Sequence, residues 1–292
     1  MRSAIRQKLN DEIPEIGGRV LDPEQAATTT VKPFMVLRQG EEALDRVWTG
    51  FKRFIEVWPY NEQQSDYQSL DELAGKVVAA LDRQQMTTSG GDKFTCRYAG
   101  TISGGDTCRY AGTVNGDYVD AQLQAITRGL QFFIPAVQPL TPAEATANDP
   151  WLEALALWTG ELLGAGWSVY RNILPTGYNC PSVLWRMAGV EVREKSGSLF
   201  EVRKKMAGHV LGSTNNQELE GALVLARELG KAVRIAIGQG EAGYCAVSAP
   251  AADYMLDPFS AGQLTVVLSG LTEKTAAAGP LMAAVHNAGL IE

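Results

Sequence analysis

Side chains that commonly perform catalysis are scarce in this chain. It contains only two histidines, His209 and His286, among 292 residues. Neither has a second histidine or a carboxylate three or four positions away, the spacing that places two metal ligands on one face of a helix. No GxSxG motif is present, so the sharp turn that exposes a hydrolase serine is not predicted. We expect both histidines to be structural or exposed, and we expect the chain not to be an enzyme.

The four cysteines lack the spacing of a metal site or of a disulfide scaffold. No CxxC pair is formed by Cys96, Cys108, Cys180 and Cys245. Such isolated cysteines usually pack as small apolar side chains. Ser213 lies just before an apolar helical pattern, where its hydroxyl could serve as the N-cap. We therefore expect no metal and no cofactor.

An excess of positive charge and a long apolar run are also absent. The chain has 26 Lys and Arg against 33 Asp and Glu, a net charge of −7. A nucleic-acid-binding face needs clustered cations, so this balance predicts a surface that DNA can pass without specific binding. No apolar stretch approaches the roughly 20 residues of a membrane span. No apolar run follows the basic residues of the first ten positions, so we expect no signal peptide, synthesis in the cytoplasm and no membrane partner.

Residues 238–243 match the pattern GxGxxG after an apolar run at 233–237. The nucleotide-binding fingerprint requires a helix directly after the glycines. Residues 244–247 (Tyr-Cys-Ala-Val) instead continue as a strand, which favours a Gly-rich hairpin. An enzyme that binds a small molecule or nucleotide between the two halves of the chain remains the alternative interpretation.

The two halves of the sequence present the same order of elements. The first predicts a helix with Ile5, Leu9 and Ile13 on one face, strands at 33–38 and 47–58, a helix carrying a Leu70, Leu73, Val77 and Leu81 stripe, and extended segments over 94–137. The second predicts a helix around 152–163, strands at 181–186 and 199–202, a helix with Leu219, Ala222, Leu225 and Leu229, and strands at 232–237 and 263–271. We therefore predict an α+β fold of two similar modules, each a mostly antiparallel sheet flanked by helices.

Fixed spacings strengthen this prediction. Five pairs of similar residues are 148 positions apart, namely Gly18 and Gly166, Pro33 and Pro181, Arg38 and Arg186, Val77 and Leu225, and Leu81 and Leu229. The closing strands match at a spacing of 141, residues 122–130 against 263–271. A duplication predicts such spacings, and similar element orders arising by chance are the competing explanation. The modules would be residues 1–138 and 151–292, joined by a Pro/Ala-rich linker at 139–150.

A local tandem repeat lies inside the first module. The sequence Thr-Cys-Arg-Tyr-Ala-Gly-Thr occurs at 95–101 and again at 107–113. Because strand side chains alternate, Cys96 and Tyr98 should share one face and Arg97 the other. Asn115-Gly116 favours a hairpin. We expect an extended β-arm that packs on a neighbouring subunit or tube through Arg97, Tyr98, Arg109 and Tyr110; the alternative is a loop without a function.

Aromatic side chains provide the other candidate interface residues. Most tryptophans and tyrosines of the chain have spacings that suit a core. The sequence Trp58-Pro59-Tyr60 at the end of a predicted strand is different, and core packing and an exposed interface anchor both remain open for Trp58 and Tyr60.

The first half resembles the tail terminator (tail completion) proteins of long-tailed bacteriophages. The resemblance covers residues 1–138 and rests on the opening helix with Arg2-Ser3-Ala4-Ile5-Arg6, the strands at 33–38 and 51–58, the helix at 70–81 and a closing β-hairpin. Because these are patterns of elements, no residue role is transferred. The second module departs from the single-module chains of that family.

The resemblance implies a structural protein of the virion, located in the tail or neck. Members of that family assemble as rings, commonly hexameric, on the last ring of the tail tube. There they stop tail polymerisation and meet head-completion proteins. The implied partners are therefore further copies of this chain, the tail tube protein and a head-completion or neck protein, with DNA passing through the ring lumen.

Overall fold

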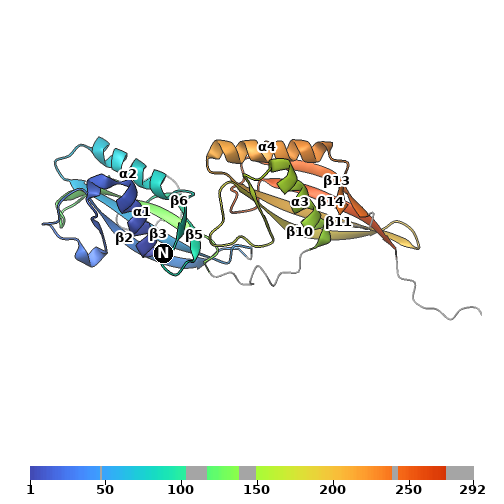
Figure 1. Ribbon diagram of the computed structural model, residues 1–292, viewed down its shortest axis with the longest axis horizontal. Helices are drawn as coiled ribbons and strands as arrows, with labels where there is room; N and C mark the ends of the chain where they lie inside the picture. Colours follow the sequence, from blue (N-terminus) through green and yellow to red (C-terminus); the bar gives the residue numbers. More distant parts are fainter. Residues whose placement is uncertain (47, 103–116, 138–148, 239–242, 274–292) are drawn as a thin grey trace, which may run out of the picture.

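The computed structural model describes residues 1–46, 48–102, 117–137, 149–238 and 243–273. Within these ranges the chain is α+β, as the sequence predicts, with two six-stranded sheets and four α-helices. Figure 1 shows the sheets following one another along the long axis, with α1 and α2 over the first and α3 and α4 over the second. We call residues 1–137 the first module and residues 149–273 the second module.

The first module is built around one helix-covered sheet. Helices α1 (Arg2–Glu12) and α2 (Tyr67–Leu81) pack on strands β2 (Phe34–Leu44), β3 (Phe51–Glu62) and β8 (Ala125–Ile134). The remaining strands are β1 (Val20–Leu21), β4 (Gln85–Thr87), β5 (Lys93–Thr95), β6 (Arg97–Ile102) and β7 (Asp117–Asp120). The sheet order is β1-β2-β3-β8-β6, with β7 also paired to β8, while β4 and β5 form a separate hairpin.

The second module has a corresponding arrangement. Helices α3 (Pro150–Leu163) and α4 (Asn215–Lys231) accompany β9 (Ser168–Arg171), β10 (Ser182–Glu194), β11 (Leu199–Leu211), β12 (Arg234–Ile237), β13 (Gly243–Ala252) and β14 (Leu264–Glu273). The sheet order is β9-β10-β11-β14-β13-β12. In each module the first strand pairs parallel with the second, and the other pairings are antiparallel.

Strand pairing places many of the matched residues at corresponding positions. Residues 33–38 and 181–186 lie at the start of β2 and β10, and a cis prolyl bond precedes Pro33 and Pro181. Each of these strands has a bulge, after Gln39 and after Met187, again 148 positions apart. The spacing of 148 therefore holds for the second strand of each module.

Both long helices start at corresponding residues and bury a similar stripe. The N-cap side chain of Asp66 accepts a hydrogen bond from the Ser69 amide, and that of Thr214 accepts one from the Gln217 amide. Thr214 is thus the N-cap, not Ser213 as expected. All four residues of the predicted first stripe are buried. In α4, Leu219 is exposed and Glu218 is buried in its place, for a reason that becomes clear at the contact between the modules.

The predicted alignment of the closing strands is wrong. A spacing of 141 equates Leu130 with Leu271, yet Leu130 is 1% exposed and Leu271 is 66% exposed. The buried, core-facing residues of β8 are Leu130, Phe132 and Ile134, and those of β14 are Leu264, Val266 and Leu268. The spacing between these sets is 134. Similar letters at the strand ends had suggested the other alignment, but only residues that face the core correspond in structure.

The predicted linker at 139–150 ends before residue 150. Helix α3 begins at Pro150, and the Asp149 carboxylate accepts hydrogen bonds from the amides of Trp151 and Leu152. Residues 138–148 lie outside the described part of the chain. Leu152 and Leu155 are buried in the predicted helix, whereas Leu162 is 37% exposed.

Candidate functional site

The two modules meet in a constellation of buried polar and aromatic side chains that lies outside the two sheet cores. Its apolar part consists of Trp48 from the β2–β3 turn together with residues of the second module, namely Leu174, Tyr178, Leu184, Leu211 and Phe259. Phe133 of β8 and Cys180 pack against this cluster. We call this constellation the module contact.

Trp48 is the centre of the module contact. Its ring centroid lies 4.1 Å from that of His209, and the Arg186 guanidinium lies 5.9 Å from the Trp48 ring. Trp48 reaches this position because the β2–β3 hairpin extends beyond its own module. Its backbone carbonyl accepts a hydrogen bond of 3.0 Å from the Leu174 amide. The tip of one hairpin is therefore inserted into the opposite module.

His209 is held in a neutral form. Arg186 Nε donates to His209 Nε2 at 2.9 Å, and His209 Nδ1 lies within hydrogen-bond distance of the Pro258 carbonyl. Since an arginine can only donate, Nε2 must be the acceptor and Nδ1 carries the proton. Burial lowers the pKa of His209 to about 4; the hydrogen bond with the Pro258 carbonyl opposes this lowering, and the Arg186 charge adds a smaller lowering. His209 is a structural histidine, as the sequence predicts; His286 lies outside the described residues.

The loop 172–181 of the second module is held by the β4–β5 hairpin of the first. The Thr95 amide donates to the Thr176 carbonyl at 3.0 Å, and the Thr95 hydroxyl donates to the Tyr178 carbonyl at 2.6 Å. The Gln85 side-chain amide donates to the Gly177 carbonyl at 2.6 Å. A Cβ at Gly177 would lie 2.3 Å from the Lys93 Cβ, so only glycine permits this approach. These bonds satisfy the loop backbone where it is buried.

A buried ion-pair network lies beside this loop. Arg97 Nη1 is 3.0 Å from Glu218 Oε1, and Arg83 Nη2 is 3.6 Å from the same oxygen. The three side chains are only 8–11% exposed. The Arg97 guanidinium also lies 5.2 Å from the Phe259 ring. Glu218 occupies the stripe position of α4 that corresponds to Leu70 of α2, and there it faces the arginines of the module contact, while Leu219 lies on the exposed side.

The predicted interface residues have different positions in the structure. Trp58 and Tyr60 are 5% and 1% exposed, so the interpretation as an exposed anchor is wrong. Both pack within the first module, on the sheet face opposite α1 and α2, in a cluster with Phe34, Val36 and Ala125. The core alternative is the one observed.

Residues 96–98, at the start of the predicted β-arm, make contacts with other residues of the same chain. Cys96 and Tyr98 face the core of the first module, and Arg97 faces the other way, as the alternation predicts. Arg97 does meet an acidic partner, but that partner is Glu218 of its own chain. Tyr98 packs against Phe132 of its own module, with 5.4 Å between the ring centroids. Arg109 and Tyr110 lie outside the described residues.

The structure places three of the cysteines and the two outer glycines of the candidate nucleotide-binding segment 238–243. Burial raises the pKa of Cys180 to about 11 and also raises the pKa of the Cys96 and Cys245 thiols, so these three remain protonated at neutral pH. Gly238 directly follows β12, and Gly243 begins β13, which pairs antiparallel with β12 as expected from the sequence. Among the described residues, no three His, Cys, Asp or Glu side chains gather as metal ligands would.

Comparison of this chain with protein-family models, with curated proteins and with solved structures finds no match. In the described ranges, no helix has the length and apolar content required to cross a membrane.

Proposed function

We propose that this chain is a structural protein of a bacteriophage tail or neck, which forms a ring that caps the tail tube and joins it to the head. We further propose that its two modules arose by duplication of one tail-terminator-like module. The resemblance of residues 1–138 to that family motivates the proposal, and the correspondence of strand order, bulges and helix caps supports the duplication.

The observation that carries the proposal is the asymmetry of the module contact. The hairpin end of the first module, with Trp48 and Thr95, contacts the loop end of the second, with Tyr178 and Glu218. Two similar units therefore meet through different surfaces. Such a heterologous contact leaves one surface of each kind free, and its repetition builds a ring or a filament.

A non-enzymatic role fits the chemistry of the described residues. The space between the modules is filled by Trp48, Tyr178 and Phe259, which pack there with a buried ion-pair network. The enzyme alternative requires a site there with an accessible acid, base or nucleophile. His209 is instead buried with both ring nitrogens engaged. We therefore favour a protein that acts through its surfaces.

The proposed partners follow from this role. Copies of the chain would form the ring, one face would meet the tail tube protein, and the opposite face would meet a head-completion or neck protein. The net charge of −7 suits a lumen through which DNA passes without specific binding. Because each chain supplies two modules, a ring of six modules would contain three chains.

Two measurements test the proposal. Light scattering and negative-stain electron microscopy of the full chain should give closed rings with a mass that is a multiple of 31.5 kDa. Inactivation of the gene in the phage that carries it should give tails of irregular, excessive length that are not joined to heads. Infectious particles with tails of normal length would contradict the proposal.

A further inference from the structure

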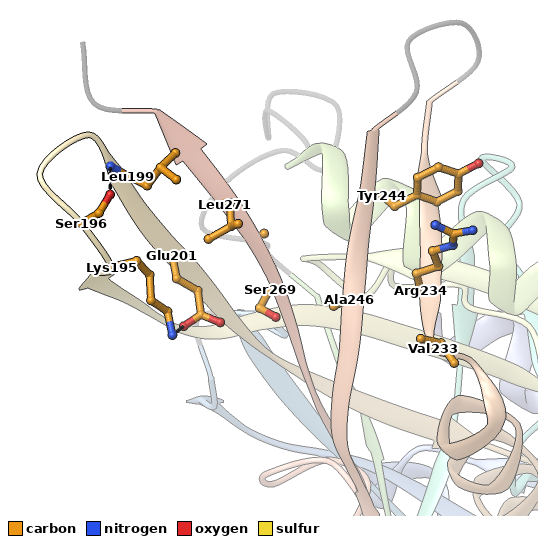
Figure 2. A pocket seen from close by; sticks show the side chains of 11 residues that line it. Lys195, Ser196, Leu199, Glu201, Val233, Arg234, Tyr244, Ala246, Ser269 and Leu271 are labelled. Carbon is orange, nitrogen blue, oxygen red and sulfur yellow. Dashed lines mark hydrogen bonds and ion pairs between the residues drawn. The ribbon is translucent and has the colours of Figure 1, made fainter. Parts of the chain in front are cut away.

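A groove on the second module corresponds to the surface by which the first module holds the loop 172–181. The groove has a volume of about 750 Å³. Figure 2 shows it over β11, β14, β13 and the start of β12, on the side reached by the β10–β11 hairpin. Its lining includes three exposed apolar or aromatic side chains: Val233 is 80%, Tyr244 51% and Leu271 66% exposed.

Strand pairing defines the correspondence of the two surfaces. In the first module Gln85 pairs with Thr95, and Thr87 with Lys93; in the second Arg234 pairs with Ala246, and Ala236 with Tyr244. Met86 and Phe94 between them are buried, as are Ile235 and Cys245. The residues that bind the loop, Gln85, Lys93 and Thr95, therefore correspond to Arg234, Tyr244 and Ala246 of the groove.

The end of the closing strand completes this correspondence. Ala136 accepts a hydrogen bond from the Thr176 hydroxyl through its carbonyl. The spacing of 134 that relates β8 to β14 equates Ala136 with Gly270, which lines the groove beside Leu271. The groove is thus a second version of the loop-binding surface, and none of the described residues covers it.

We propose that this groove binds the loop 22–33 of a second copy of the chain, so that chains join head to tail through an interface that repeats the module contact. The loop 22–33 occupies the place of 172–181, between the first and second strands of its module. Ile173, Leu174 and Tyr178 are buried under the first module, whereas Val31 in the corresponding loop is 66% exposed. One end of the chain therefore presents an uncovered loop, and the other presents an uncovered groove.

Side-chain size at the two hairpin tips is complementary to this arrangement. Within the chain, the large Trp48 tip packs on His209. Val36 pairs with Trp58 as Leu184 pairs with His209, so Trp58 occupies the position of His209 in the first module. Arg38 lies over Trp58 at 5.3 Å, as Arg186 lies over Trp48. Trp58 thus already places an aromatic ring at this position of the first module, so a hairpin tip that packs against it must be small.

The free hairpin tip meets this requirement. The β10–β11 turn consists of residues 195–198, Lys-Ser-Gly-Ser, and carries no aromatic side chain. A small tip facing Trp58 fills the same volume as a large tip facing His209. Charge is also compatible with the contact, because Arg234 lines the groove beside the Lys195–Glu201 ion pair and the loop carries the exposed Glu24.

This inference rests on the proposed function only for its biological setting. The geometry itself predicts head-to-tail assembly of the chain alone.

The experiment uses two single variants of the full chain that each destroy one surface. Leu271→Glu places a charge in the groove, and Val31→Glu places one on the loop. Each should weaken self-association about a hundredfold, because assembly would remove water from a carboxylate at a position that the unchanged chain fills with an apolar side chain. Both positions are exposed in the single chain, so its melting temperature should not change. Leu223→Glu on α4, which lies on neither surface and is also exposed, is the control and should assemble as the unchanged chain does.

Mixing the two variants gives the deciding result in light scattering. The intact groove of the Val31→Glu chain can bind the intact loop of the Leu271→Glu chain, so an equal mixture should form dimers of two chains and nothing larger. A mixture that stays monomeric, a variant that still assembles alone, or an unchanged chain that is monomeric over the whole accessible concentration range would overturn the inference. Rings that persist in either variant would overturn it while leaving the proposed function intact. Head-to-tail assembly in a phage whose tail length does not depend on this chain would overturn only the proposed function.

Discussion

The Trp48 ring of the first module lies 4.1 Å from the His209 ring of the second, at an interplanar angle of 44°. Trp48 lies in a turn between two strands, yet it is only 7% exposed because the opposite module covers it. His209 presents a neutral ring, whose two nitrogens are bonded to Arg186 and Pro258. This pair shows how the two modules are joined: the tip of the β2–β3 hairpin packs in an apolar cluster with residues of the second module.

Replacing Trp48 with alanine should destabilise the chain by about 3–5 kcal/mol, because the truncation removes a buried indole and leaves a cavity against His209. Urea denaturation followed by circular dichroism gives the free energy of unfolding. Leu44→Ala, on the same hairpin but 64% exposed, is the matched control and should change it by less than about 0.5 kcal/mol. Equal effects of both substitutions would contradict the module contact.

Replacing Glu218 with leucine should cost about 3–5 kcal/mol, because Arg97 would remain buried without the carboxylate that lies 3.0 Å from it, whereas Arg83 would keep its ion pair with Asp82. Leu70 occupies the corresponding position of α2 in the first module, so the helix itself tolerates leucine there. The double variant Arg97→Met with Glu218→Leu should recover much of the lost stability, since the residual buried charge is reduced. A double-mutant cycle measured by urea denaturation tests this, and strictly additive losses would contradict a coupled pair.

Acidification should weaken the chain through His209. Its pKa is about 4 in the folded chain and close to 6.5 when unfolded, so the unfolded state binds more protons between these values. Stability is therefore fully present above pH 6.5 and is lost as the pH falls towards 4, by up to about 3 kcal/mol. Thermal unfolding across this range measures the effect. His209→Gln should be less stable at neutral pH and should lack the part of the pH dependence due to this residue; an unchanged pH profile would refute the assignment.

Glycine at 208 is required by the indole of Trp185. A Cβ built there would lie 2.6 Å from Trp185 Cζ3 and 3.0 Å from the Leu264 Cβ. Gly208→Ala should therefore cost about 1–3 kcal/mol through overpacking. Gly189→Ala is the control on the paired strand, because no atom lies within 4 Å of its added Cβ. The two melting temperatures give the comparison, and a neutral Gly208→Ala would show that Trp185 can move aside.

The sequence predicted those parts of the fold that depend on local patterns. The stripe on α2 and the strands that follow Pro33 and Pro181 were correctly located, because helical and strand periodicity is encoded within each segment. The closing-strand alignment was wrong for the opposite reason. Which residue of β14 corresponds to Leu130 depends on pairing with β11, a contact between residues far apart in the chain.

The module contact could be predicted only in part. The alternation of Cys96, Arg97 and Tyr98 followed from strand geometry, which turns Arg97 away from the other two side chains. Its partner Glu218 did not follow, because Glu218 belongs to a helix of the other module. Trp58, near the end of β3, is buried within its own module. Trp48, in a turn, is buried against the other module.

The sequence by itself determined the α+β class, the repeated order of elements and the scarcity of groups that could perform catalysis, because these depend on composition and on spacing along the chain. Only the tertiary structure decided where the modules touch and which surfaces remain uncovered. The loop 172–181 and the loop 22–33 are similar in position along their modules, yet one is buried and the other is exposed. That difference arises because burial depends on which surface a neighbouring module covers. The first module covers the loop 172–181, and the described residues of the second module do not cover Val31 in the loop 22–33.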